Sequence, residues 1–238
     1  MKEIPMKSAF EKNFDINLKL RMTLGVLMFV GLMFAIIFLS AGRLNYWNGW
    51  LYFLLFSYFE LFTFLIIPSE LIKERYGIPP ETKKWDKIIY FVFTALGNIN
   101  PLIAALDGGR YHWTGDFPLW VNVVAFAVIF LGYSLTVISL RKNRFFSATV
   151  RIQKERDQYV IDKGPYALVR HPGYAGIIFS SIVIPIAMNS LWALIPAGLF
   201  VVTLVIRTYL EDITLQKELP GYGEYVDRVR YRLFPWIW

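Results

Sequence analysis

The feature that most constrains this 238-residue chain is a run of 35 residues without a charged side chain, at positions 172–206. One helix of that length would be about 52 Å long, whereas the hydrocarbon core of a bilayer is about 30 Å thick. Met188, Asn189 and Ser190 interrupt the run with polar groups near its middle. We therefore predict a helical hairpin that turns at these three residues.

Four further runs with few or no charges are long enough to cross a bilayer as helices. They cover residues 22–42, 44–69, 88–106 and 117–140. Hydrophobic residues make up 56% of the chain, which is too apolar for an ordinary soluble domain. The predicted fold class is therefore all-α: a polytopic integral membrane protein of about six membrane segments, the last two of which form the hairpin.

Lysine and arginine residues alternate in number along the connections between these segments. From the N-terminus, successive connections carry five, one, five, one, eight, none and five of the 25 basic residues. Because basic residues are enriched in cytoplasmic connections, both termini and the loop at 141–171 are predicted to face the cytoplasm. The membrane is then a cell inner membrane or an endomembrane. This topology explains the net charge of +7, so the charge does not indicate nucleic-acid binding.

Two classes of reactive site are disfavoured by residue counts. The chain has no cysteine, which excludes thiol nucleophiles, disulfides and iron–sulfur ligation. Its two histidines, His112 and His171, lie in separate predicted loops without neighbouring ligand-type residues. We predict no metal site.

Two segments rich in aromatic and basic residues flank the hairpin. Residues 141–161 are predicted to form an amphipathic helix that anchors to lipid headgroups rather than contacting a substrate. The C-terminal tail, residues 221–238, carries three tyrosines and two tryptophans. Such side chains settle at the membrane surface, where the tail could cover the loop before the hairpin.

The residues best suited to a functional site are concentrated in a predicted loop at residues 162–176. Two prolines and three glycines interrupt helix formation there and allow backbone angles that other residues avoid. Arg170 and His171 lie inside this loop, directly before the apolar hairpin. A strong hydrogen-bond donor and an ionisable ring in that position suit a site that joins a polar reagent to an apolar substrate.

Three charged residues, Arg207, Glu211 and Asp212, follow the uncharged run. Arg207 and Glu211 are four residues apart and therefore share a helix face. Taken alone, they would indicate a membrane-flanking arginine paired with the next helical turn. If the hairpin arms are antiparallel, however, Tyr174 and Arg207 lie close together, and the loop and the acidic pair face one pocket.

These two motifs, in this order, resemble those of the isoprenylcysteine carboxyl methyltransferase family, within a wider group of membrane methyltransferases that includes phosphatidylethanolamine methyltransferases. The resemblance covers roughly the last hundred residues. It implies S-adenosylmethionine as cofactor, although the sequence has no Rossmann-type glycine-rich motif. It divides the chain into N-terminal membrane helices, 1–140, and a catalytic cofactor-binding region, 141–238. By resemblance, the cofactor shell consists of Gly164, Tyr166, His171, Pro172, Tyr174, Gly176, Glu211 and Asp212.

The predicted function is S-adenosylmethionine-dependent methyl transfer to a lipophilic acceptor at the cytoplasmic membrane face. A carboxylate acceptor needs no general base, but it does need a cation. Arg170 and Arg207 are predicted to hold it through paired hydrogen bonds. This favours carboxyl methylation of an isoprenylcysteine-like or other anionic substrate. A phospholipid amine or a small thiol stays open as acceptor, with His171 or Glu211 as the base that removes its proton.

Two functions of other classes fit the sequence less well than methyl transfer. Membrane sterol-type NADPH reductases have a C-terminal segment similar to residues 231–235, but this chain is short for them and carries the acidic pair. A transporter would place coupling charges near the membrane midplane or show inverted repeats, and neither is evident here. The predicted partners are the lipid bilayer and the methyl acceptor. The sequence does not identify the acceptor, the oligomeric state or the pathway.

Overall fold

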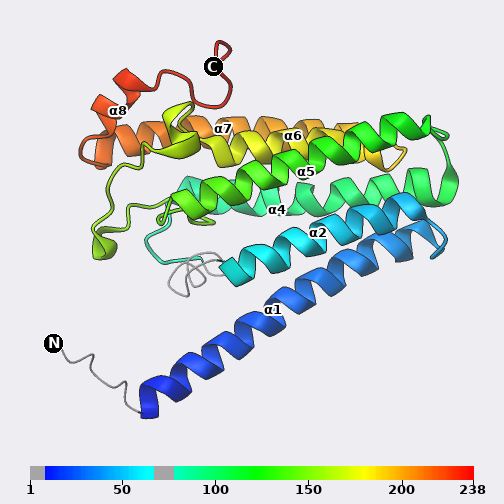
Figure 1. Cartoon of the computed structure of the whole chain (residues 1–238), viewed down its shortest axis with the longest axis horizontal. Coiled ribbons are helices and arrows are strands. Elements are labelled where there is room, and N and C mark those ends of the chain that lie inside the picture. The colour runs from blue at the N-terminus through cyan, green and yellow to red at the C-terminus, as the bar shows by residue number, and fades with distance from the viewer. Residues whose placement is uncertain (1–8, 67–77) are drawn as a thin grey trace.

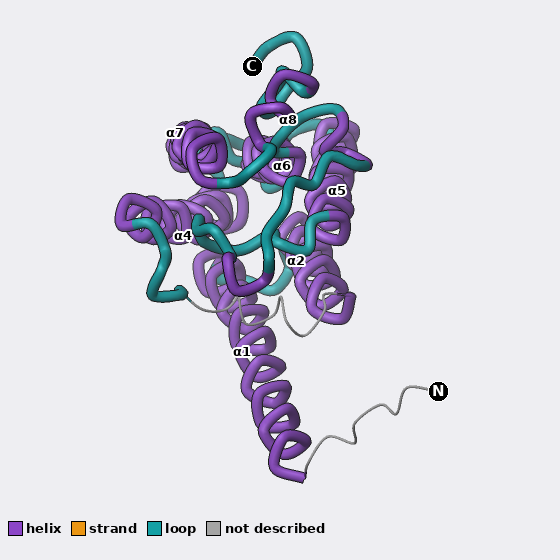
Figure 2. The backbone as a smooth tube through the Cα atoms, turned by 90° about the vertical axis from the view of Figure 1, so that its left-hand side faces the viewer, coloured by secondary structure: helices purple, strands orange, loops and turns teal. Residues whose placement is uncertain are grey.

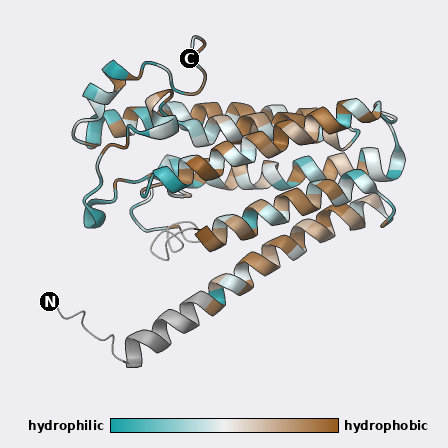
Figure 3. Ribbon diagram, viewed as in Figure 1, coloured by the Kyte–Doolittle hydropathy of each residue, from teal (hydrophilic) through white to brown (hydrophobic). Residues whose placement is uncertain are grey.

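The computed structural model describes residues 9–66 and 78–238, and this part of the chain is all-helical. Within it, five helices are long and apolar enough to cross a membrane, and one shorter apolar helix accompanies them. Figure 3 shows hydrophobic residues along the middle of the bundle and hydrophilic residues gathered towards its two ends. The predicted fold class, a polytopic helical membrane protein with about six apolar segments, is confirmed.

Each predicted span corresponds to a helix. In chain order the helices are α1 (Ala9–Ala41), α2 (Trp47–Ile66), α4 (Lys84–Ala104), α5 (Leu119–Lys142), α6 (Pro172–Ala187), α7 (Leu194–Glu218) and α8 (Tyr222–Arg228). Helix α1 begins well before the first uncharged run, and α7 continues well beyond the last one. A π-helical turn, η1 (Ala105–Tyr111), directly continues α4. The predicted end of the second span, residues 67–69, lies outside the described residues.

The last two membrane helices, α6 and α7, form the predicted hairpin, and its turn contains Met188, Asn189 and Ser190. Asn189 adopts a left-handed backbone conformation, with φ of 58°. Its side chain accepts a 2.7 Å hydrogen bond from Asn122 and donates a 3.0 Å bond to Asp116, which fixes the turn against α5 and its preceding loop. After the turn α7 runs without a break to Glu218, so the acidic pair lies on a continuous helix.

Helix α6 lies in the middle of the part of the bundle that holds the predicted site, with α5 and α7 on either side of it (Figure 2). Its contact with α5 is very close at Gly132 and Gly176, because a Cβ on either glycine would overlap atoms of the other helix. Small residues at such a contact let helix backbones approach within a membrane. Helix α1, in contrast, crosses the others at an angle and extends away from them (Figure 1).

The two ends of the bundle differ in composition. At the right-hand end of Figure 1 lie the α1–α2 connection, the segment between η1 and α5, and the α6–α7 turn. Six exposed aromatic residues mark this end: Trp47, Trp50, Tyr111, Trp113, Trp120 and Trp192. Aromatic belts of this kind form at a membrane–water interface. The opposite end carries the 143–161 loop, α8 and the C-terminal segment, and there the predicted site residues gather.

Candidate active site

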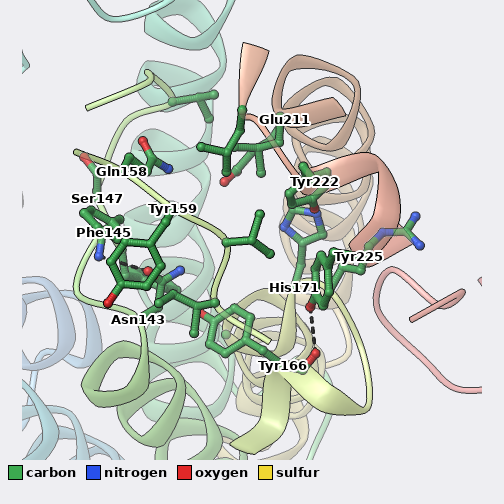
Figure 4. Close-up of a pocket in the computed structure, with 18 of the residues that line it drawn as sticks. Asn143, Phe145, Ser147, Gln158, Tyr159, Tyr166, His171, Glu211, Tyr222 and Tyr225 are labelled. Carbon is green, nitrogen blue, oxygen red and sulfur yellow. Dashed lines mark hydrogen bonds between the residues drawn. The ribbon is translucent and has the colours of Figure 1, made fainter. Parts of the chain in front are cut away.

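A cavity opens at the end of the bundle opposite the aromatic belt. Its walls come from the 143–161 loop, the turn η3 (Gly164–Ala167), the first turn of α6, the second half of α7, and α8. Figure 4 shows these segments surrounding the cavity, with Glu211 on one side and Asn143 and Tyr166 on the other. Five of the predicted site residues line it: Tyr166, Arg170, His171, Tyr174 and Glu211.

The start of α6 positions two of these side chains. Pro172 occupies the first turn of the helix, where its missing N–H has no consequence, and His171 precedes it as the N-cap residue. The rings of His171 and Tyr174 are stacked, with centroids 5.7 Å apart. The hydroxyl of Tyr174 donates a 2.6 Å hydrogen bond to Glu211 Oε2 on α7. Loop, α6 and α7 therefore meet at the cavity through direct side-chain contacts.

Asp212 lies behind the cavity wall and is fully buried. Its carboxylate accepts two hydrogen bonds from Arg170, from Nε at 2.8 Å and from Nη2 at 3.0 Å. It also accepts bonds from Tyr222 at 3.0 Å and Arg232 Nε at 2.9 Å, and His171 Nε2 lies 3.4 Å away. Burying a carboxylate is costly unless it is paired and hydrogen-bonded, and two guanidinium groups meet that requirement here.

The C-terminal segment holds the Arg170–His171 backbone in place. The N–H of Arg170 donates to the carbonyl of Tyr231 at 2.9 Å, and the N–H of His171 donates to the carbonyl of Arg232 at 2.8 Å. The Arg170 side chain completes the contact by donating from Nη1 to the carbonyls of Val229 and Arg230, at 2.7 and 2.8 Å. All three guanidinium nitrogens of Arg170 are therefore occupied by the protein itself.

Buried tyrosines close the cavity beside this segment. The hydroxyl of Tyr225 donates a 2.7 Å hydrogen bond to the carbonyl of Tyr166 (Figure 4). Burial raises the pKa of Tyr166 and of Tyr225 above the ordinary value. Burial, followed by the neighbouring Asp212 charge, likewise raises the pKa of Tyr222. These phenols stay protonated near neutral pH and act there as neutral donors.

Arg207 pairs with Asp86 of α4 and not with the next turn of its own helix. Its Nε donates to Asp86 Oδ1 at 2.8 Å, and its Nη2 donates to Asp86 Oδ2 at 3.2 Å and to the carbonyl of Ala148 at 2.5 Å. The guanidinium carbon lies 5.6 Å from the centre of the Tyr174 ring. Arg207 Nη1 forms no hydrogen bond with any residue that the structure describes.

The remaining predicted residues shape the backbone around the cavity rather than lining it. Gly164 has φ of 65°, a conformation that favours glycine, at the start of η3. Gly176 lies at the close α5–α6 contact described above. The structure thus brings the loop and the acidic pair together at one cavity, with Gly176 and Arg207 beside it rather than in its wall.

The 143–161 loop contributes to the cavity wall in a way that was not predicted from the sequence. The prediction of an amphipathic helix there is wrong, because the segment is irregular except for a short 3₁₀ turn, η2 (Lys154–Arg156). Gln153 is 1% exposed and donates a 2.8 Å bond from Nε2 to the carbonyl of Phe145, which folds the loop back on itself. The loop residues that line the cavity include Asn143, Phe145, Ser147, Gln158 and Tyr159. Uncharged polar residues in a basic loop were the available signal, since a headgroup anchor does not require them.

Comparison with known proteins bears on the same region. Residues 121–217 match the model of the isoprenylcysteine carboxyl methyltransferase (ICMT) family. No curated protein sequence matches the chain. The fold is similar to that of the eukaryotic intramembrane Ras methyltransferase ICMT solved without a monobody, with a TM-score of 0.52 and 16% identity. That alignment covers 97% of this chain and 88% of the solved one. The resemblance predicted from the two sequence motifs is confirmed.

Proposed function

We propose that the chain is a member of the isoprenylcysteine carboxyl methyltransferase family, whose model residues 121–217 match, and that it transfers a methyl group from S-adenosylmethionine to a lipophilic carboxylate. The observation that supports this most directly is the meeting of His171, Tyr174 and Glu211 in one cavity at the end of an apolar helix bundle. A polar cofactor and a membrane-dissolved acceptor can reach such a site from different sides.

The side chains around the cavity fit the chemistry of S-adenosylmethionine. Its ammonium and ribose hydroxyls need acceptors, and Glu211 Oε1 forms no hydrogen bond with the described residues. Its adenine needs aromatic neighbours, and Phe145, Tyr159 and Tyr166 line the cavity. Gln158 adds a neutral amide to the same wall. We propose that these residues hold the cofactor, which when bound supplies an electrophilic methyl group.

The buried layer around Asp212 has a supporting role in this proposal. Asp212 orients Arg170, and the C-terminal segment orients the backbone of Arg170 and His171. In-line displacement depends on alignment of the reacting groups and on exclusion of water, so a rigid wall contributes directly to the rate. Of the cofactor shell expected by resemblance, Gly164, Pro172 and Gly176 set the backbone path, while Tyr166, His171, Tyr174 and Glu211 present side chains.

The two arginines predicted to clamp the acceptor carboxylate differ in the donors they offer. Every nitrogen of Arg170 is bonded to Asp212 or to backbone carbonyls. Arg207 keeps Nη1 unbonded among the described residues, and it lies beside Tyr174, whose hydroxyl is bonded to Glu211. We propose that Arg207 binds the acceptor carboxylate and that Arg170 holds the loop. A carboxylate acceptor is already a nucleophile, so the step requires no general base.

The proposal includes the orientation and the division of the chain. The cavity end faces the cytoplasm, the source of the cofactor, in accordance with the distribution of basic residues. Residues 141–238 supply the cavity wall and include α6 and α7, and residues 1–140 supply the other membrane helices. The two regions are not independent in space, because α4 contributes Asp86 to the Arg207 pair and α5 packs on α6.

A binding and transfer experiment tests the proposed function. Purified protein in lipid nanodiscs is titrated calorimetrically with S-adenosylhomocysteine and, separately, with NADPH. It is then incubated with methyl-labelled S-adenosylmethionine and a prenyl-thioether acceptor ending in a carboxylate, an amine or a thiol. We expect S-adenosylhomocysteine to bind, NADPH not to bind, and label to reach the carboxylate. Transfer to the amine alone would replace carboxyl methylation by amine methylation, and binding of NADPH alone would support a reductase.

A further inference from the structure

Asp86 is the residue of α4 that forms an ion pair with Arg207, on the proposed acceptor side of the site. It is fully buried in the first turn of that helix. Its Oδ1 accepts a 2.8 Å hydrogen bond from Arg207 Nε, and its Oδ2 accepts a 3.2 Å bond from Arg207 Nη2. Two parallel bonds of this kind fix the plane of a guanidinium group as well as its position.

The same carboxylate also holds the wall of the cofactor cavity. Asp86 Oδ2 accepts a 2.6 Å hydrogen bond from the N–H of Val150, a residue that lines the cavity. Two neighbouring contacts extend this attachment: Lys83 N–H donates to the Val150 carbonyl at 3.1 Å, and Thr82 Oγ1 bonds Thr149 Oγ1 at 3.1 Å. The segment before α4 and the 149–150 segment therefore lie side by side, with Asp86 at their junction.

We infer that Asp86 is a positioning residue for the methyl acceptor: it sets the plane of Arg207 so that Nη1 faces the acceptor carboxylate. This inference rests on the proposed function. The position of Arg207 supports it, because with Nε and Nη2 directed to Asp86 and to the Ala148 carbonyl, Nη1 is the guanidinium nitrogen left for a ligand. A guanidinium held at only one nitrogen would rotate about its side chain and lose that alignment.

Two substitutions separate the two attachments of Asp86. Asp86→Asn keeps one carbonyl oxygen, which can still accept from Val150 N–H, but it loses the charged two-point bond to Arg207. Asp86→Ala removes both attachments. Glu218→Gln is the matched control, because Glu218 also joins α7 to the start of α4, through a 2.6 Å pair with Lys83, but at an exposed position.

The decisive measurement is a double-mutant cycle on methyl transfer to a prenyl-thioether carboxylate, using full-length protein in nanodiscs. We expect Asp86→Asn to lower turnover at saturating acceptor by about tenfold or more and to change S-adenosylhomocysteine affinity by less than about threefold. Asp86→Ala should also weaken S-adenosylhomocysteine binding. Arg207→Lys combined with Asp86→Asn should be no slower than Arg207→Lys alone, because residues that act through one contact are not additive.

The cycle also defines the results that overturn the inference. Independent, multiplying effects of Asp86→Asn and Arg207→Lys would show that Asp86 does not act through Arg207. Equal loss in Glu218→Gln would assign the effect to general weakening of the α4–α7 contact. S-adenosylhomocysteine binding reports whether the Asp86→Asn protein is folded. If that protein is unfolded, Asp86→Glu, which keeps the charge, becomes the test variant. It must then restore both S-adenosylhomocysteine binding and partial turnover. A wild-type protein that binds S-adenosylhomocysteine but methylates no carboxylate would reject the proposed function and this inference with it.

Discussion

The phenol of Tyr174 and the carboxylate of Glu211 join the two arms of the last hairpin at its open end, through a hydrogen bond of 2.6 Å. Tyr174 lies in the first turn of α6 and Glu211 lies on α7. The bond uses one carboxylate oxygen and leaves Oε1 without a partner among the described residues. This contact therefore joins the two arms of the hairpin, and it leaves one oxygen of the Glu211 carboxylate able to accept a hydrogen bond from a ligand in the cavity.

Replacing Glu211 by glutamine tests this second role. Glutamine keeps an oxygen that can accept from Tyr174, so the hairpin contact should survive while the charge is lost. We expect Glu211→Gln to weaken S-adenosylhomocysteine binding by about 1.5 to 3 kcal/mol, the range for hydrogen bonds to charged groups. Isothermal titration calorimetry measures the change, with Glu218→Gln on the same helix as control. Unchanged affinity in folded Glu211→Gln protein would assign the carboxylate a purely structural role.

Gly176 distinguishes packing from cofactor contact. A Cβ at this position would overlap the Gly132 carbonyl and the Thr136 side chain of α5, whereas a Cβ at Gly198 of α7 would meet nothing within 4 Å. We expect Gly176→Ala to lower the free energy of unfolding by about 1 to 3 kcal/mol, the amount typical of overpacking, and therefore to lower the midpoint of thermal unfolding. Gly198→Ala should leave it unchanged or raise it slightly. If Gly176→Ala unfolds like wild type but loses S-adenosylhomocysteine affinity, the cofactor-shell prediction gains support over packing.

The sequence alone was sufficient for the membrane segments and for the hairpin, because both depend on local composition. The length of the uncharged run at 172–206 required it to fold back, and its polar residues placed the turn at Met188–Ser190. The proximity of Tyr174 to residues 207–212 followed from the same geometry. Each of these inferences needed only the positions of charged and polar residues, the lengths of the runs between them and the thickness of a bilayer.

The pairing of Arg207 could not be predicted in this way. Asp86 lies 121 residues away, among Lys83, Lys84 and Lys87, where an acidic residue in the first turn of a helix already has a local explanation in the helix dipole. The 143–161 loop was misjudged for a similar reason. Its basic and aromatic residues suit a membrane surface, and only tertiary contacts such as that of Gln153 with Phe145 fold it over the cavity.

The absence of cysteine from the sequence makes membrane orientation directly measurable. Single cysteines at Glu155 and Trp113 mark the two ends of the bundle, and both native side chains are largely exposed. With intact cells or sealed vesicles, we expect a membrane-impermeant maleimide to label Trp113→Cys from outside, and Glu155→Cys only after permeabilisation. The reverse pattern would contradict the cytoplasmic orientation of the cavity. The unmodified chain is the blank.

Alkaline pH should destabilise the cavity end through its buried phenols. The pKa values of Tyr166, Tyr222 and Tyr225 are raised by burial in the folded protein, so the unfolded chain releases these protons first. Their contribution to stability is therefore complete below about pH 10 and is lost as pH rises above it. Thermal unfolding followed from pH 8 to 11 should show this loss, and Tyr222→Phe should show a shallower fall. If the stability of Tyr222→Phe falls with pH as steeply as that of the wild type, the buried Tyr222 phenol does not cause the loss.

The contrast between the two arginines provides the final test of their separate roles. Arg170 is bonded through all three guanidinium nitrogens to Asp212 and the carbonyls of Val229 and Arg230, and a lysine cannot replace those bonds from one nitrogen. We expect Arg170→Lys to lose about 3 kcal/mol or more of stability, as for a broken buried pair, and to weaken S-adenosylhomocysteine binding. Arg207→Lys should instead lower turnover with little change in cofactor affinity. Unfolding, cofactor affinity and acceptor saturation are measured for both variants. If Arg170→Lys is stable and is defective only towards the methyl acceptor, then Arg170, and not Arg207, binds the acceptor carboxylate.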